Sequence, residues 1–393
     1  MDHRFARRAT LTQDSFITEI FKYLADKDVI SFSGGFPNPL TFPLIDLQSS
    51  VQKVFLNEGS AVLQYATTHG DLDLRTFIAE RYHNRQKFVV HPDHILITSG
   101  SQQALDYIGK VFLEPGDVIL IEEPSYLGAI QAFTSYEVDI QTVQLEVDGI
   151  DLLDLEAKIK RFNPKLIYLI PSFQNPSGIS YSNVKRLAVA EILVKHKIML
   201  IEDDPYSELY YDGNIHQPIG SRLKDQSILL GSFSKTISPG MRVGWVSASK
   251  EVYKKLFTAK EASDLHSSSL DQRILATYLR DYDYDEHLNK LRTFYSHQHR
   301  IMLDAIQQYF PKEVKVYPSN GGMFIWIELP EGMSSMKLFY EAVKVKLVFV
   351  PGDPFYVDKQ DSNTLRLSFA NETPERIIEG IRRLGVLIQQ TIQ

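Results

Sequence analysis

The sequence predicts an α/β protein, with a large domain built around a mainly parallel central sheet and a smaller α/β domain at the C-terminal end. Between residues 46 and 285, short unbroken apolar runs alternate with helical patterns, which is typical of a sheet built from crossover units. After residue 285, the strand-like segment 324–328 alternates instead, and an amphipathic helix follows Thr373. With 393 residues, 44% of them hydrophobic, the chain can form a core for each domain.

The N-terminal arm, residues 1–45, is expected to act as a lid and to belong to the small domain. Ile17, Ile20, Phe21 and Leu24 share one helical face, and the glycines and prolines of segment 34–39 then require a loop.

Strands of the central sheet are expected at 95–97, 118–121, 166–170, 198–201 and 228–230. Runs that are apolar throughout suit strands covered on both faces, so helices should lie on both sides of this sheet. We place the large domain at 46–285 and the small C-terminal domain at 286–393.

Composition excludes several classes of function. The formal net charge of -7 is mixed along the chain, so no basic face predicts binding to nucleic acid. The absence of cysteine excludes disulfides, thiolate metal sites and cysteine nucleophiles, and we expect no metal site. No signal-peptide pattern and no membrane-spanning run is present, so a cytoplasmic location is expected.

Polar residues follow four of the buried runs. Tyr126 comes after the run that ends at 121, Asn175 after 170, Asp203 and Tyr206 after 201, and Lys235 after 230. In open parallel sheets, ligands gather outside the carboxyl ends of the strands. These side chains are therefore expected to converge on one cleft.

Lys235 lies between a buried strand and the apolar run 243–246. Partial desolvation would lower its pKa and make it an amine suited to a Schiff base. A lone loop lysine is more often simply solvated. Ser232, Ser234 and Arg242 favour the functional interpretation, because hydroxyls and a guanidinium at this spacing are donors for a phosphate.

Three further positions carry chemistry. Ser101 and Gln102 open a helix, where free N–H groups bind anions, although such residues are more often simple caps. Asp203 and Tyr206 face one ligand or form an acidic turn, and Asp204 competes for the carboxylate's role. Arg366, in an otherwise apolar strand, needs an anionic partner, either a substrate carboxylate or an internal ion pair.

Together these strings resemble the fold-type I, class I/II aminotransferases that depend on pyridoxal 5'-phosphate (PLP). The resemblance is strongest to the branch of 2-aminoadipate aminotransferases, kynurenine aminotransferase II and MocR effector domains, and it covers nearly the whole chain. Its specific motifs are Ser-x-Ser-Lys-x-x-x-Pro-Gly-x-Arg at 232–242 and Asn-Pro-x-Gly at 175–178, with Asp-x-x-Tyr at 203–206 in the same order.

The resemblance implies a role for each candidate residue. Lys235 would form the internal aldimine and shuttle the proton, Asp203 would pair with the pyridine nitrogen, and Asn175 and Tyr206 would bind the ring oxygen. Tyr126 would stack on the ring. The implied phosphate-binding residues are Ser101, Gln102, Ser232, Ser234, Arg242 and, from the neighbouring subunit of a homodimer, Tyr65. The implied substrate-binding residues are Gly35, Asn175 and Arg366.

One departure concerns the amino donor. Aminoadipate-type relatives have Ile-Arg-Glu in the mobile N-terminal helix, whereas this chain has Ile17-Thr18-Glu19. Without that arginine, a distal carboxylate loses a charge-assisted contact unless Arg4, Arg7 or Arg8 replaces it. With Tyr65, Phe36 and Phe355 nearby, we predict ping-pong transfer from an apolar or aromatic amino acid to a 2-oxo acid such as 2-oxoglutarate.

Three alternatives stay open from the sequence: a 2-aminoadipate-type aminotransferase, a PLP-dependent β-lyase, and a severed effector domain of a transcription regulator. The cofactor permits elimination as well as transamination. Only about thirty residues precede the Gly34-Gly35 loop, which is shorter than a DNA-binding domain of usual size and disfavours the regulator.

Overall fold

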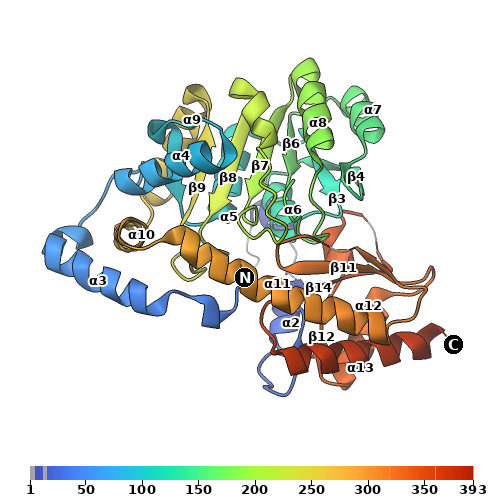
Figure 1. Ribbon diagram of the computed structural model, residues 1–393. Coiled ribbons are helices and arrows are strands. Elements are labelled where there is room, and N and C mark those ends of the chain that lie inside the picture. Colours follow the sequence, from blue (N-terminus) through green and yellow to red (C-terminus); the bar gives the residue numbers. More distant parts are fainter. Residues whose placement is uncertain (1–4, 12–15, 318, 359, 393) are drawn as a thin grey trace.

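The computed structural model describes residues 5–11, 16–317, 319–358 and 360–392. An eight-stranded sheet forms its centre, in the order β2-β9-β8-β7-β6-β3-β4-β5 (Figure 1). Its strands are β2 (Ile95–Thr98), β3 (Val118–Glu123), β4 (Asp139–Glu146), β5 (Gly149–Ile150), β6 (Leu166–Leu169), β7 (Met199–Asp204), β8 (Ser227–Ser232) and β9 (Gly244–Ala248).

The sheet is mainly parallel, as predicted. Strands β8, β7, β6, β3 and β4 run parallel to one another, whereas β9 is antiparallel to both of its neighbours and β5 is antiparallel to β4. The helices around it are α4 (Leu72–Gln86), α5 (Ser101–Phe112), α6 (Leu127–Thr134), α7 (Leu152–Phe162), α8 (Asn183–His196), α9 (Lys250–Asp264) and α10 (Ser269–Asp281).

Both faces of the sheet are covered, which explains the unbroken apolar runs. Ile167 and Leu169 of β6 pack in one core with Leu193 of α8. Leu166 and Tyr168, on the opposite face, belong to the main core. Neighbouring residues of a strand point to opposite faces, so a strand between two helical layers is apolar at nearly every position.

A second sheet, β10-β11-β14-β13, is antiparallel throughout. It consists of β10 (Lys315–Tyr317), β11 (Phe324–Glu328), β13 (Val350–Pro351) and β14 (Thr364–Ser368), and its helices are α11 (Tyr284–Tyr309), α12 (Ser335–Lys344) and α13 (Pro374–Ile392). The expected alternation along 324–328 is wrong as a pattern of burial, because residues 324–327 are all buried. The ring of Phe324 packs edge-on against Tyr206, which follows β7, at 5.8 Å between centroids, while Ile325 joins the main core.

The N-terminal arm joins the C-terminal part of the chain. It contains α1 (Arg7–Leu11), α2 (Phe16–Phe21) and β1 (Ile30–Ser31), and β1 pairs in parallel with β12 (Leu347–Val348). Glu372 accepts a hydrogen bond from the Ser31 N–H at 2.6 Å, and Arg376 donates to the Val29 carbonyl at 2.6 Å. The domain boundaries predicted at 45 and 285 stay predictions.

Helix α3 (Leu44–Glu58) lies at the periphery of the molecule beside α10 (Figure 1), and its Val54 packs with Ile274 of that helix. Its Leu44, Ile45 and Leu56 are exposed, as is Leu63 just beyond it. Within the described ranges, no helix combines the length and the apolar character needed to cross a membrane.

Candidate active site

A cavity of about 320 Å³, called the site cavity below, opens where the carboxyl ends of β6, β7 and β8 meet the N-terminal arm and β14. Every predicted site residue except Tyr65 lines it: Gly35, Ser101, Gln102, Tyr126, Asn175, Asp203, Tyr206, Ser232, Ser234, Lys235, Arg242 and Arg366. The parallel register brings together side chains that lie far apart in the sequence, because the carboxyl ends of these strands share one edge.

Lys235 lies in the turn after β8, and its Nζ donates a hydrogen bond to the Gly35 carbonyl at 2.7 Å. Burial lowers the pKa of this amine to about 8, and the positive charges of Arg366 and Arg242 act in the same direction. A substantial fraction of the amine is therefore neutral near pH 7 to 8, as a nucleophilic lysine requires.

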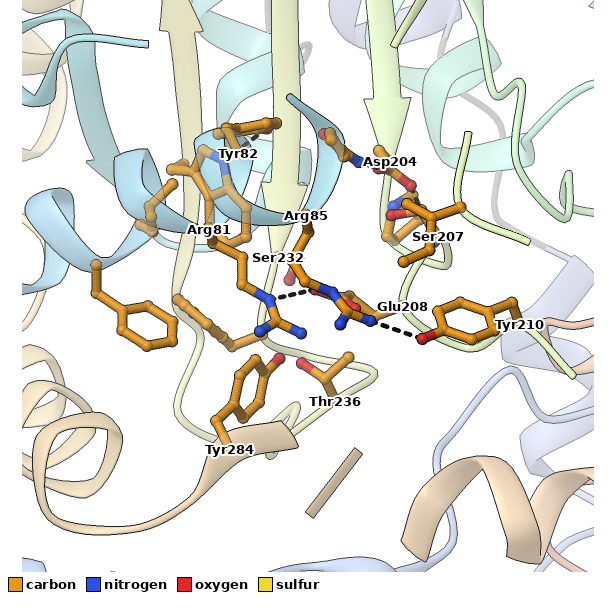
Figure 2. A pocket seen from close by; sticks show the side chains of 17 residues that line it. Arg81, Tyr82, Arg85, Asp204, Ser207, Glu208, Tyr210, Ser232, Thr236 and Tyr284 are labelled. Atoms are coloured by element: carbon orange, nitrogen blue, oxygen red, sulfur yellow. Dashed lines mark hydrogen bonds and ion pairs between the residues drawn. The ribbon is translucent and has the colours of Figure 1, made fainter. Parts of the chain in front are cut away.

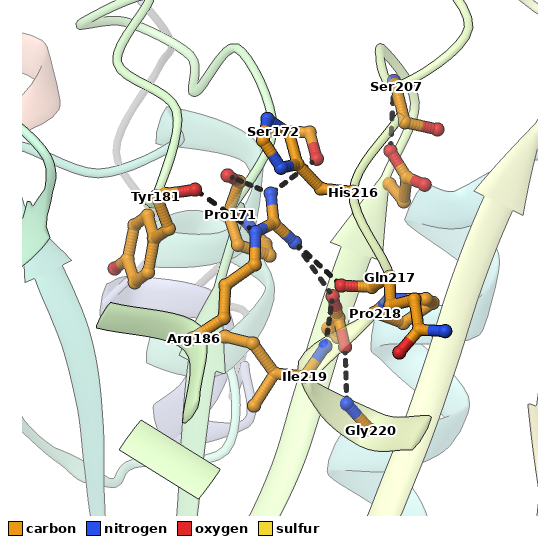
Figure 3. Close-up of polar contacts among 12 residues, drawn as sticks. Pro171, Ser172, Tyr181, Arg186, Ser207, His216, Gln217, Pro218, Ile219 and Gly220 are labelled. Carbon is orange, nitrogen blue, oxygen red and sulfur yellow. Dashed lines mark hydrogen bonds and ion pairs between the residues drawn. The ribbon is translucent and has the colours of Figure 1, made fainter. Parts of the chain in front are cut away.

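The acids Glu202, Asp203 and Asp204 of β7 have three different environments. Glu202 accepts from the N–H groups of Ile219 and Gly220 and lies 3.9 Å from Arg186 (Figure 3). Asp204 accepts from the Ser207 N–H at 3.0 Å and lines a separate cavity of about 60 Å³ (Figure 2). Because side chains alternate along a strand, only Asp203 faces the site cavity.

The two oxygens of the Asp203 carboxylate differ in their hydrogen bonding. Oδ2 accepts from the Tyr168 hydroxyl at 2.8 Å, whereas the buried Oδ1 has no hydrogen-bond partner in the described part of the chain. Burial raises the pKa of this carboxyl to about 6. A buried, unpaired carboxylate oxygen suits the protonated nitrogen of a pyridine ring, so this position fits PLP.

An anion site lies where α5 begins. Its N-cap residue, Gly100, has φ 84° and provides no side-chain cap, so the first N–H groups of the helix are available to a ligand. A Cβ at Gly100 would lie 2.3 Å from a nitrogen of Arg242, which donates to the Ser99 carbonyl at 3.0 Å. The hydroxyls of Ser232 and Ser234 are 2.8 Å apart, and the Arg242 guanidinium lies 3.5 Å from the latter.

Gln102 and Tyr126 contact each other. The Gln102 amide donates to the Gly128 carbonyl at 2.7 Å and accepts from the Tyr126 hydroxyl at 3.4 Å. The side chain of Gln102 is thus held at the start of α6, and its position in the first turn of α5 still brings its backbone to the anion site.

Arg366 is a buried cation that has no acid partner among the described residues. Its guanidinium carbon lies 4.2 Å from the ring centroid of Phe324 and 5.1 Å from that of Phe355. It donates to Asn175 Oδ1 at 2.8 Å and to the Ser33 carbonyl at 2.6 Å, and its Nε has no hydrogen-bond partner within the part of the chain that the structure describes. Among the described residues no carboxylate forms an ion pair with it, so the internal ion pair that the sequence left open is not present there.

The remaining predicted residues lie elsewhere. Tyr65 is 79% exposed and packs edge-on against His266, outside the site cavity. Ile20, Leu24 and Phe36 line the cavity, whereas Arg4 and the side chains of Ile17 and Phe21 lie outside the described residues. Arg7 forms an ion pair with Glu137 at 2.8 Å.

Sequence reasoning missed Tyr168 and the Ser33 carbonyl. Tyr168 is concealed within an apolar strand, and only the period-two register of β6 against β7 places it beside Asp203. The contact of the Ser33 carbonyl with Arg366 carries no side-chain signal at all.

This fold and this cavity define a PLP-dependent transferase of fold type I. The family model for aminotransferases of class I and II matches residues 27–384. The chain is 40% identical to a 2-aminoadipate transaminase of Thermus thermophilus, covering 97% of this chain and 95% of the relative. It is 36% identical to aromatic-amino-acid aminotransferase 1 of Thermococcus litoralis, covering 99% and 95%.

A solved structure is also similar along nearly its whole length. It is the alpha-aminoadipate aminotransferase of Thermus thermophilus complexed with N-(5'-phosphopyridoxyl)-L-leucine, with a TM-score of 0.92, 39% identity and coverage of 99% of this chain and 98% of that one. The chain therefore belongs to the class I and II aminotransferase family. It is an aminotransferase that uses PLP, with amino acids and 2-oxo acids as substrates.

Proposed function

We propose that this enzyme moves the amino group of an apolar or aromatic amino acid to a 2-oxo acid, with Lys235, Asp203 and Tyr206 as its catalytic residues. The observation that carries the proposal is the site cavity, which brings the amine of Lys235, the unpaired oxygen of Asp203 and the unpaired cation of Arg366 to one space. PLP supplies an aldehyde that condenses with amines and a ring that accepts electrons from the substrate α-carbon.

In this proposal the residues of the cavity hold the cofactor by its charged and polar groups. The start of α5 at Ser101 and Gln102, together with Ser232, Ser234 and Arg242, binds the phosphate. The free oxygen of Asp203 would accept a hydrogen bond from the protonated ring nitrogen, Asn175 and Tyr206 would bind the ring oxygen, and Tyr126 would stack on the ring.

Lys235 and Arg366 act on the substrate. The neutral Lys235 amine, with its pKa of about 8, takes the proton from the substrate α-carbon on Nζ and would release it at the other end of the 1,3 proton shift, not back to the α-carbon. Arg366 binds the α-carboxylate with its planar fork, and this contact supplies the anionic partner that a buried guanidinium requires. The Gly35 carbonyl, 2.7 Å from Nζ, holds the lysine toward the substrate loop.

The lining of the cavity supports an apolar donor. Its described cations are Lys235, Arg242 and Arg366, and each has a role in the reaction already assigned above. The arm contributes Ile20, Leu24 and Phe36, which would pack against an apolar side chain. Arg7 is engaged by Glu137, so it is not free to replace the arginine that the Thr18 position lacks.

The relatives leave two donors to compare, because one is named for 2-aminoadipate and the other for aromatic amino acids. Steady-state kcat/KM with phenylalanine, leucine and 2-aminoadipate as donors, and 2-oxoglutarate as acceptor, tests the proposal. We expect phenylalanine or leucine to exceed 2-aminoadipate. A strong preference for 2-aminoadipate would overturn it and support the 2-aminoadipate-type alternative.

A homodimer with shared sites is part of the proposal. Tyr65 is exposed and lies outside its own site cavity, and the segment before it also exposes large apolar side chains at Leu44, Ile45, Leu56 and Leu63. An exposed apolar surface of this kind is typical of a subunit interface. In the dimer, Tyr65 would donate to the phosphate of the neighbouring subunit. A cytoplasmic location and the absence of nucleic-acid and membrane partners complete the proposal.

A further inference from the structure

Tyr168 lies beside Asp203 because of the register between two parallel strands. On β6 it is the partner of Ile201 on β7, so Asp203, two residues further along, lies diagonally across on the same face of the sheet. The phenol hydroxyl donates to Asp203 Oδ2 at 2.8 Å, and both side chains are buried. The two residues are 35 positions apart in the sequence.

Tyr168 reaches the site through Asp203. It does not line the site cavity, and its ring packs edge-on against Phe133 of α6, 6.0 Å between centroids. Its hydroxyl donates the hydrogen bond that the Asp203 carboxylate accepts. Within the described part of the chain, no lysine or arginine forms an ion pair with Asp203. With Oδ2 engaged in this way, Oδ1 is the oxygen left for a ligand.

We propose that Tyr168 is a positioning residue for transamination: its hydroxyl fixes the Asp203 carboxylate so that Oδ1 meets the cofactor's ring nitrogen, and it keeps that carboxylate ionised. This inference rests on the proposed role of Asp203. It assigns a task to a tyrosine that touches neither substrate nor cofactor.

The electrostatic surroundings of Asp203 make this donor important. Burial is the main cause that raises the pKa of Asp203, the neighbouring charge of Asp204 adds to it, and the hydrogen bond from Tyr168 opposes it. The negative charge of Asp203 also acts on Tyr82, Glu122, Tyr126 and Tyr206, and the cations of the site cavity are Lys235, Arg242 and Arg366.

The phenol itself stays protonated at every working pH. Burial raises the pKa of Tyr168 far above its ordinary value, and the negative charge of Asp203 raises it further. Tyr168→Phe therefore removes one donor and changes no charge. In this variant the pKa of Asp203 should rise, so a larger fraction of the carboxyl should be protonated as the pH falls below 8. A protonated carboxyl is less able to accept the hydrogen bond from the ring N–H.

The test compares PLP affinity of the full-length wild-type and Tyr168→Phe proteins, measured by titration of the visible absorbance between pH 6 and pH 8.5. We expect the dissociation constant of Tyr168→Phe, divided by that of the wild type, to increase roughly tenfold as the pH falls across this range. A tenfold change is about what the loss of one hydrogen bond to a charged group produces. Taking the ratio cancels the titration of Lys235 and of the phosphate. A ratio that does not change with pH would overturn the inference.

Tyr181→Phe is a matched control. Tyr181 is as fully buried as Tyr168, and its hydroxyl also donates to a buried carboxylate, Glu122 Oε1, at 2.8 Å. The chemical change is identical, but the carboxylate that loses its donor is Glu122, which does not line the site cavity as Asp203 does. This variant should show a ratio near one at all pH values, and thermal unfolding followed by circular dichroism shows whether both variants fold.

The Asp203→Asn background separates this inference from the proposed function. If Asp203→Asn weakens PLP binding and removes the pH-dependent effect of Tyr168→Phe, both ideas are supported. If Asp203→Asn weakens binding while Tyr168→Phe alone has no effect, only the role of Tyr168 fails. If Asp203→Asn binds PLP as the wild type does, the role of Asp203 fails, and that of Tyr168 fails with it.

Discussion

Replacing Arg366 with methionine should remove most of the activity and leave the stability of the ligand-free protein nearly unchanged. The guanidinium is 4% exposed, and burial lowers its pKa to about 10 from 12.5. That difference corresponds to about 3 kcal/mol of unfavourable charge burial. The hydrogen bonds lost to Asn175 and the Ser33 carbonyl have neutral acceptors and lie at the low end for a charged donor, about 1.5 kcal/mol each, so they offset this amount and the net change in unfolding free energy should be within about 1 kcal/mol.

The catalytic loss is much larger. Two charge-assisted hydrogen bonds to an α-carboxylate, at about 1.5–3 kcal/mol each, predict a decrease in kcat/KM of roughly 10²- to 10⁴-fold for every amino donor. Steady-state kinetics with phenylalanine and leucine measures this decrease, and urea unfolding followed by circular dichroism measures the stability.

Arg186→Met is the matched control. Arg186 is 5% exposed, donates to the Pro171 carbonyl at 2.6 Å and to the Ser172 hydroxyl at 2.9 Å, and lies 3.9 Å from the buried Glu202 (Figure 3). Its removal leaves Glu202 buried without a cation and should cost about 3 kcal/mol of stability, with little effect on kcat/KM of the folded enzyme. The reasoning is refuted if Arg366→Met unfolds as easily as Arg186→Met, or if it keeps wild-type kcat/KM.

Other substitutions and conditions test separate parts of the site. The rate of PLP capture should rise between pH 6.5 and pH 8, because only the neutral Lys235 amine, with its pKa of about 8, attacks the aldehyde. Stopped-flow absorbance measures this rate, and a rate that does not change with pH would contradict the expectation. Gly100→Ala should weaken PLP binding roughly tenfold or more by displacing Arg242, whereas Gly213→Ala, at a similar φ of 78° with open space around it, should cost only about 1 kcal/mol of stability. Tyr65→Phe should weaken PLP binding without changing the monomer fold, and an effect equally large in a forced monomer would exclude contact across a dimer.

The sequence predicts the position of the site better than the orientation of the groups within it. Apolar runs that end in polar residues locate the carboxyl edge of the sheet, and Asn175, Asp203, Tyr206 and Lys235 all lie on the cavity there. This works because a parallel sheet exposes its residues chiefly at strand ends.

The register between neighbouring strands could not be predicted from the sequence. In a strand covered on both faces, the hydrophobic pattern does not distinguish the two sides of the sheet. The pattern alone therefore does not show whether Asp203 or Asp204 faces the cavity, or which of them Tyr168 contacts. The direction of the Gln102 side chain toward the Gly128 carbonyl depends on how α5 packs beside α6, which is also a tertiary property. The antiparallel insertion of β9 between β2 and β8 likewise has no local signature.

The pairing of β1 with β12 has a practical consequence for recombining this enzyme with its relatives. The loop that presents Gly35 to Lys235 follows β1, which pairs with residues 347–348, and Arg376 of α13 bonds to the carbonyl of Val29 just before β1. If only the first 45 residues were exchanged, the arm of one parent would have to pair with the β12 and α13 of the other. A chimera intended to transplant donor preference should therefore carry both ends of the chain from the same parent, keeping only the central sheet and its helices from the other.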